Sequence, residues 1–215
     1  LIGALTRAPG DDNTAGYLDR VDIESTTLVL VDEVSAQRWL TPDATLNFRR
    51  AGADVDIEAT LPVFEEGKRW DLTAKGRYAA ASGNLQIALN VDGFRPTRIA
   101  GLAPQLAPFG MIDLRLSGTA AATMRLERSS ARFSNLEFDV KGQDGRLRLP
   151  DPVALDIPVK AVSLKGTAGS DLDRITIEQF RVELDGAGQS SPVITVTGEG
   201  SALNNAPSVE LTFRM

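Results

Sequence analysis

The chain has 215 residues, of which 42% are hydrophobic, 24% charged and 6% aromatic, with a net charge of −6 and neither cysteine nor histidine. The absent residues exclude thiol nucleophiles, Ser-His triads, histidine-ligated zinc and histidine pH switches. The acidic balance argues against a nucleic-acid partner, because neutralising phosphates requires a basic stripe.

The sequence contains no run of about 18 apolar residues, so it predicts no membrane-spanning helix, and it contains no signal peptide. The chain begins at Leu1 rather than methionine, which predicts a segment of a longer protein whose anchor lies elsewhere.

The first predicted strand alternates apolar and charged residues up to Ile23, and residues 28–31 are apolar on both faces. Because Ile23 and Leu28 are an odd number of positions apart, we expect a β-bulge near residues 24–26. The bulge would place Leu28 and Leu30 on the face that Ile23 begins, with the alternate valines outside.

A three-stranded meander is predicted next. Apolar and polar residues alternate over residues 55–63, 70–78 and 85–91, and turn residues occupy 65–68 and 81–84. Such an antiparallel meander has one apolar and one polar face.

Residues 94–109 interrupt this pattern. Ile99, Leu102 and Leu106 have helical spacing, Thr97 is a candidate N-cap, and prolines limit the length. We expect one short helix over residues 96–108, which connects strands or flanks a groove, and a soft joint around residues 94–110.

The alternating pattern then resumes. One-residue slips between Phe133 and Leu136, and between Ile177 and Phe180, predict further bulges, whereas Asp144-Gly145 predicts a turn. The expected strands cover residues 112–118, 133–142, 162–168, 175–184, 193–198 and 209–213.

The apolar faces of these strands must be removed from water. A sandwich, a closed barrel and a curved sheet lined with lipid all achieve this, and periodicity alone does not separate them.

The order of the segments carries a resemblance. "VDIESTTLVLVDEVSAQRWLTPDATLNFRR", "KRWDLTAKGRYAAASGNLQIALNVDGFRPTRIAGLAPQLAPF" and "VSLKGTAGSDLDRITIEQFRVELDGAGQSSPVITVTGEG" resemble successive units of the AsmA-like superfamily, above all of its large bridge-type proteins of the bacterial envelope. The resemblance covers about residues 15–200. Gln37-Arg38 departs from it, because the family often has glycine before the tryptophan position.

The resemblance implies an all-β fold with one or two short helices, in which one elongated, curved antiparallel sheet over residues 1–215 forms a hydrophobic groove. A β-sandwich or open barrel is the alternative fold. It further implies a periplasmic protein, anchored to the inner membrane through a segment outside this chain, that binds or conducts phospholipid or other acyl-chain lipid between the inner and outer membranes and supports outer-membrane integrity.

The residues expected to line the groove are the inward apolar side chains of the predicted strands. Each of them taken singly is better explained as core, and the resemblance favours the groove only for the set as a whole. They are Leu28, Leu30, Leu46, Phe48, Ile57, Leu61, Leu72, Leu85, Ile87, Leu89, Leu114, Leu116, Leu164, Ile175, Ile177, Val182 and Leu184.

We expect no enzyme, no cofactor and no metal site. The candidate carboxylates are typical of turns. Asp32-Glu33 is expected in a turn at the rim of the sheet, Glu65-Glu66 in a solvated turn, and Asp171-x-Asp173 in a turn before a strand. The phosphate-loop and nucleophile-elbow motifs are absent from the sequence. Trp39 and Trp70 are expected to cover the rim. The alternative function is a scaffolding β-domain that binds envelope proteins through its sheet edges.

Overall fold

The computed structural model describes residues 18–31, 38–65, 68–98, 100, 104–126, 131–148, 154–170, 174–185, 192–200 and 209–214. The strands are β1 (Arg20–Val31), β2 (Arg38–Ala51), β3 (Asp54–Glu65), β4 (Lys68–Ala79), β5 (Asn84–Phe94), β6 (Ile112–Leu126), β7 (Ala131–Arg148), β8 (Asp156–Ala168), β9 (Ile175–Leu184), β10 (Val193–Gly200) and β11 (Val209–Arg214), and the 3-10 helices are η2 (Pro96–Arg98) and η3 (Pro104–Met111).

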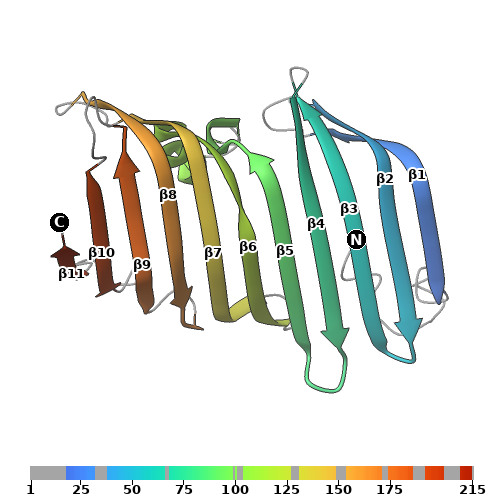
Figure 1. Cartoon of the computed structure of the whole chain (residues 1–215). Coiled ribbons are helices and arrows are strands. Elements are labelled where there is room, and N and C mark those ends of the chain that lie inside the picture. The colour runs from blue at the N-terminus through green and yellow to red at the C-terminus, as the bar shows by residue number, and fades with distance from the viewer. Residues whose placement is uncertain are drawn as a thin grey trace.

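All eleven strands form one sheet in chain order, and each pairs antiparallel with its sequence neighbours. The sheet is curved and open, with β1 and β11 at opposite edges (Figure 1). The predicted all-β, elongated, curved antiparallel sheet is therefore confirmed. Among the described residues no second sheet covers it, and none of their helices is long and apolar enough to cross a membrane.

A tight hairpin joins β2 and β3. Ala51 pairs with Asp54, so Gly52 and Ala53 alone close the β2–β3 hairpin, and Gly52 has a φ of +65°. A glycine is suited to this turn because it lacks the Cβ that disfavours positive φ. The predicted meander is β3, β4 and β5, whose ends extend one to three residues beyond the predicted ones.

The predicted bulge in β1 is confirmed. Ser25 has a φ of +48°, and the β1–β2 register shifts between Ile23 and Thr26 and again before Leu28. Beyond the bulge Val29 faces away from the core and is 52% exposed, while Leu28 pairs with the buried Thr41. The predicted rim turn at residues 32–33 lies outside the described residues.

The predicted turn at Asp144-Gly145 is wrong, because β7 runs through both residues to Arg148. Asp144 has a φ of +47°, and the β6–β7 register shifts opposite it, between Asp113 and Arg115. Asp144 therefore forms a bulge within β7 and not a turn, because pairing with β6 on one side and β8 on the other keeps the chain extended.

The other predicted slips are confirmed as bulges. Met124 pairs with Phe133 while Thr123 pairs with Asn135, which leaves Ser134 as the extra residue. Phe180 and Ile177 pair with Val196 and Gly198, so a second extra residue lies in β9.

The single predicted helix is wrong, because the segment forms the two 3-10 helices η2 and η3. Thr97 lies inside η2 rather than capping it. Proline has no N–H to donate and tolerates only the first turn of a helix, so Pro104 begins a new helix instead of continuing the first. The sheet continues across this segment, since β5 pairs directly with β6.

Glycines occur where neighbouring strands approach closely. A Cβ built on Gly118 would overlap the carbonyl oxygen of Asp139 and lie 2.7 Å from the Cα of Val140. One on Gly166 would lie 2.8 Å from the Phe138 ring. These contacts show that β6, β7 and β8 approach one another closely at these glycines.

Replacing Gly118 by alanine should therefore destabilise the fold by about 1–3 kcal/mol, the usual cost of overpacking. The matched control is Gly76→Ala, on the same face of β4, where the nearest heavy atoms to the new Cβ are 4.0 Å away. That change should be neutral or slightly stabilising, because glycine weakens a strand interior. Urea unfolding of both variants measures the difference, and equal stabilities would contradict the close approach of the strands.

Candidate functional site

The sheet has an apolar face that is unbroken across the strands. Directly paired residues of antiparallel strands project to the same side, so the register defines rows of side chains across the sheet. One row, from β1 to β10, contains Ile23, Leu46, Ala59, Ala74, Leu89, Ala120, Phe138, Gly166, Ile177 and Gly198.

Two further rows flank the first on the same face. The row on one side contains Val21, Phe48, Ile57, Gly76, Ile87, Ala122, Leu136, Ala168, Ile175 and Gly200. The row on the other side begins at β3 and contains Leu61, Leu72, Val91, Gly118, Val140, Leu164, Phe180 and Val196. Together the three rows are called the apolar lane, and none of their residues is charged or polar.

The apolar lane differs along its length. Near β6, β8 and β9 it adjoins a packed core, in which Leu114, Val159 and Val182 are 1%, 2% and 5% exposed. Across β4 and β6 it includes the small residues Ala74, Gly76, Ala120 and Ala122, and Leu89 on β5 is 38% exposed. The lane thus has an exposed apolar side chain near its middle, whereas it adjoins buried side chains near β8 and β9.

The structure brings the predicted groove residues onto this one face. Of that set, only Leu30 has a side chain outside the described part of the chain. Phe48, Leu85, Leu114 and Val182 are buried, and the other described members are half-buried apart from the exposed Leu89. Whether they contact a ligand stays a prediction.

Sequence reasoning missed the small residues at the centre of the lane. The strand predicted at residues 112–118 continues to Leu126, and Ala120 and Ala122 belong to the lane. The intervening residues of β6 are Thr119, Ala121 and Thr123, so the polarity contrast between the faces is too weak to reveal the alternation.

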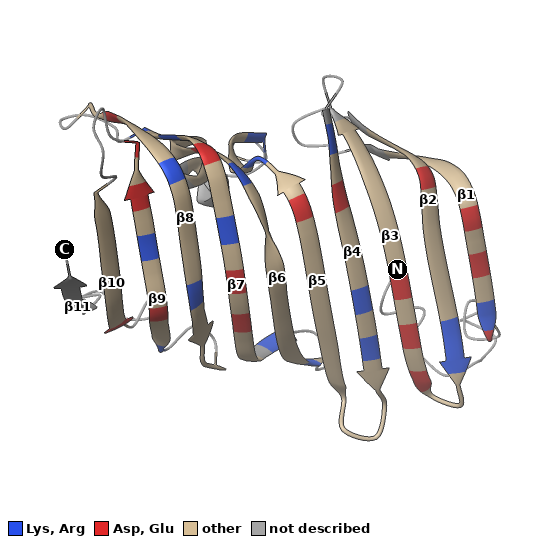
Figure 2. Cartoon of the chain, viewed as in Figure 1, with Lys and Arg blue, Asp and Glu red and all other residues tan. Residues whose placement is uncertain are grey.

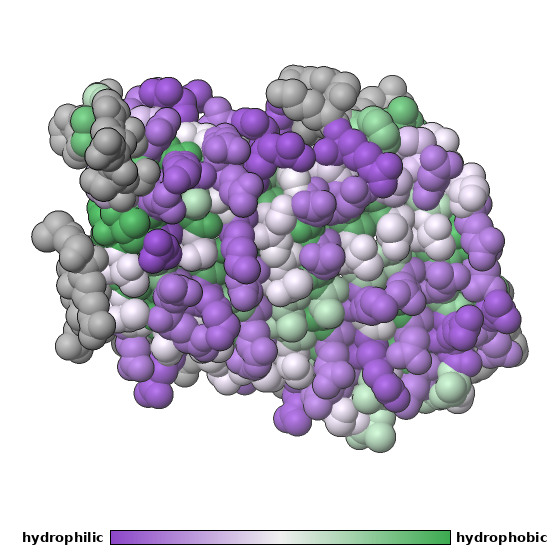
Figure 3. Space-filling model, viewed as in Figure 1, coloured by the Kyte–Doolittle hydropathy of each residue, from purple (hydrophilic) through white to green (hydrophobic). Residues whose placement is uncertain are grey.

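The opposite face is polar, and it carries the large concavity. Figure 3 looks onto this face and shows mostly hydrophilic side chains. A concavity of about 880 Å³ extends from β1 to β7. Its charged lining residues are Arg20, Asp22, Glu24, Arg49, Asp56, Glu58, Lys75, Arg77 and Glu137.

Ion pairs within and between strands neutralise much of this polar face. Lys75 Nζ lies 2.6 Å from Glu58 Oε1, and Arg77 Nε lies 3.8 Å from Asp56 Oδ1. Figure 2 shows acidic residues along β3 and mostly basic residues along the neighbouring β4. Mutually paired, exposed charges solubilise a sheet face, and they supply no activated nucleophile or general base.

The rim at the start of β4 carries an aromatic contact. The rings of Trp70 and Phe94 meet edge to face, with centroids 5.2 Å apart and planes at 61°. The side chain of Trp39 lies outside the described residues.

No family model, curated protein or solved structure matches this chain. The fold and its two faces are therefore known from the coordinates of this chain alone.

Most of the candidate carboxylates lie outside the described residues, among them Asp32, Glu33, Asp171 and Asp173. Within the described part of the chain, no three or more acidic, cysteine or histidine side chains are grouped so that they could hold a metal ion.

The Lys160–Glu183 pair, with Nζ and Oε1 2.7 Å apart, makes stability depend on pH. Its hydrogen bond lowers the pKa of Glu183 below the ordinary 4.5 and raises the pKa of Lys160 above 10.5. The stabilisation is complete above pH 4.5 and below pH 10.5. It is lost as the pH falls through the lowered pKa of Glu183 or rises through the raised pKa of Lys160.

Glu183→Gln should therefore lower the melting temperature slightly at neutral pH, and its difference from the parent should disappear at strongly acidic pH. The control is Glu199→Gln on β10, a strand carboxylate with no ion pair among the described residues. Thermal melts across pH measure both variants, and an equal effect of the two changes would contradict the stabilising pair.

Proposed function

We propose that this chain binds the acyl chains of phospholipid or a similar lipid along its apolar lane, without catalysis. The observation that carries the proposal is the lane itself, whose rows cross the sheet without a charged residue. Each CH₂ group that a lipid buried there would contribute about 0.8 kcal/mol.

The length of the lane supports passage as well as binding. From β1 to β10 there are nine strand spacings of about 4.8 Å, which is roughly 43 Å. One leaflet of a bilayer contributes about half of a hydrocarbon core of about 30 Å. The lane is thus longer than one acyl chain, and its uniform chemistry gives a chain no single preferred position.

The cellular setting that we propose rests on the AsmA-like resemblance. In that setting the chain is a periplasmic segment of a longer protein, anchored in the inner membrane through a part outside this chain, and it conducts lipid between the inner and outer membranes. Lipid movement along the lane would then support outer-membrane integrity.

A second candidate function is favoured by the free edge at β1. This strand is 12 residues long, and among the described residues it pairs only with β2. Such an edge can accept a strand from another protein. A scaffolding role through this edge would leave the apolar lane as core.

Ala120→Asp should abolish lipid capture, because it places a charge in the middle of the lane. Ala121→Asp is the matched control, since the same residue type, one position along β6, projects from the polar face and is exposed. Native mass spectrometry after incubation with phospholipid vesicles should detect lipid on the parent and on Ala121→Asp only.

Circular dichroism of both variants separates lost binding from unfolding. Leu28→Asp gives an independent test at the β1 end of the same face. A parent chain that carries no lipid, or a folded Ala120→Asp chain that carries as much as the parent, would refute the proposal.

A further inference from the structure

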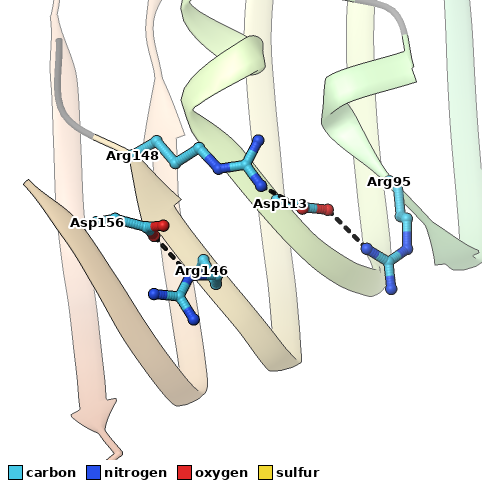
Figure 4. A network of polar contacts seen from close by, with 5 residues as sticks. All are labelled: Arg95, Asp113, Arg146, Arg148 and Asp156. Atoms are coloured by element: carbon cyan, nitrogen blue, oxygen red, sulfur yellow. Dashed lines mark hydrogen bonds and ion pairs between the residues drawn. The ribbon is translucent and has the colours of Figure 1, made fainter.

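Three arginines gather at the rim of the sheet near η2. Arg95 follows the last residue of β5, Arg98 ends η2, and Arg148 is the last residue of β7. With Thr97 and Asp113 they line a pocket of about 310 Å³. Figure 4 shows the Asp113 carboxylate between the side chains of Arg95 and Arg148.

The hydrogen bonds to Asp113 occupy only some of the guanidinium N–H donors of Arg95 and Arg148. Arg95 Nη1 lies 2.6 Å from Asp113 Oδ1, and Arg148 Nη2 lies 3.3 Å from Asp113 Oδ2. A guanidinium has five N–H donors, so one bond to Asp113 engages only part of each fork. The Asp113 carboxylate holds both arginines beside the same pocket.

Arginines predominate in the pocket. Among the described residues, its lining has three arginines and one carboxylate, in a chain of net charge −6. The concavity on the polar face differs, because its lining has more carboxylates than cations. The side chains of Arg95 and Asp113 are 27% and 26% exposed, so water screens them less than surface charges.

We propose that Arg95, Arg98 and Arg148, with the Thr97 hydroxyl, bind a phosphate group in this pocket. Arginine forks match phosphate oxygens in bidentate geometry, and bonds between ionised partners are the strongest hydrogen bonds in proteins. The pocket volume lies at the lower end of the range for ligand sites, which suits a phosphate and its first ester group.

The position of the pocket suggests the source of the phosphate. Asp113 lies between Ile112 and Leu114, and Arg148 follows Leu147, so the two charged side chains project from the polar face at the rim, opposite the core to which these three apolar residues belong. A phospholipid with its acyl chains on the lane could place its headgroup around the rim in the pocket. This assignment to a lipid headgroup rests on the proposed function, whereas phosphate binding itself does not.

Calorimetric titration with inorganic phosphate at low salt tests the site. Arg148→Ala should weaken binding about tenfold or more, the expected loss of one charge-assisted bond. The matched control is Arg146→Ala on the same strand, because Arg146 pairs with Asp156 and does not line the pocket. Arg148→Lys should show a partial loss, and it replaces Arg148→Ala if that variant does not fold.

The test compares the phosphate affinities of the Arg146→Ala and Arg148→Ala variants. No binding by the parent chain, or equal losses in Arg146→Ala and Arg148→Ala, would overturn the phosphate site. Unchanged binding by Arg146→Ala together with weakened binding by Arg148→Ala supports it.

Photocrosslinking with phosphatidic acid and with diacylglycerol of identical acyl chains distinguishes the sources. If Arg148→Ala reduces crosslinking of phosphatidic acid alone, the site takes a lipid headgroup. If Arg148→Ala weakens the binding of inorganic phosphate but leaves the crosslinking of both lipids unchanged, the site takes a soluble phosphate. If neither lipid crosslinks to the parent, lipid binding along the lane fails while the calorimetric result stands.

Discussion

The structure depends on a phase constraint: the side-chain alternation of every strand must match that of its neighbours. Side chains alternate with a period of two, so a slip of one residue would move the apolar side chains of a strand to the face that contacts water. The bulges maintain the match. The bulge at Ser25 restores the alternation of β1 relative to its neighbour, the bulge at Asp144 restores that of β7, and an extra residue restores that of β9. With the phase maintained, the lane stays free of charge across the sheet.

The same constraint separates the chemistry of the two faces. Apolar residues collect on one side, and their neighbours in sequence are left to form the polar side, where pairs such as Lys165–Glu178 link adjacent strands. The glycines of the apolar side then allow neighbouring strands to approach closely, because a side chain at Gly118 or Gly166 would collide with the next strand. An apolar face and a solvated polar face thus arise from one alternating pattern.

The rim is where this constraint ends. Beyond Phe94 the chain no longer needs to alternate, and the 3-10 helices occupy the gap before β6. There Asp113 and Arg148, near the ends of β6 and β7, meet Arg95, which follows β5. The proposed binding of a phospholipid assigns its acyl chains to the apolar lane and its headgroup to this pocket.

The sequence by itself determined the strand class, the meander of β3 to β5 and the apolar set, because period-two alternation is a local property. It also located the bulge of β1 near residues 24–26, since an odd spacing within a strand usually means a bulge or a bend. Only the tertiary structure decided that Asp144-Gly145 continues β7, because pairing on both sides outweighs a local turn preference. It alone placed the large concavity on the polar face and assembled the arginine pocket, whose members come from strand ends far apart in the sequence.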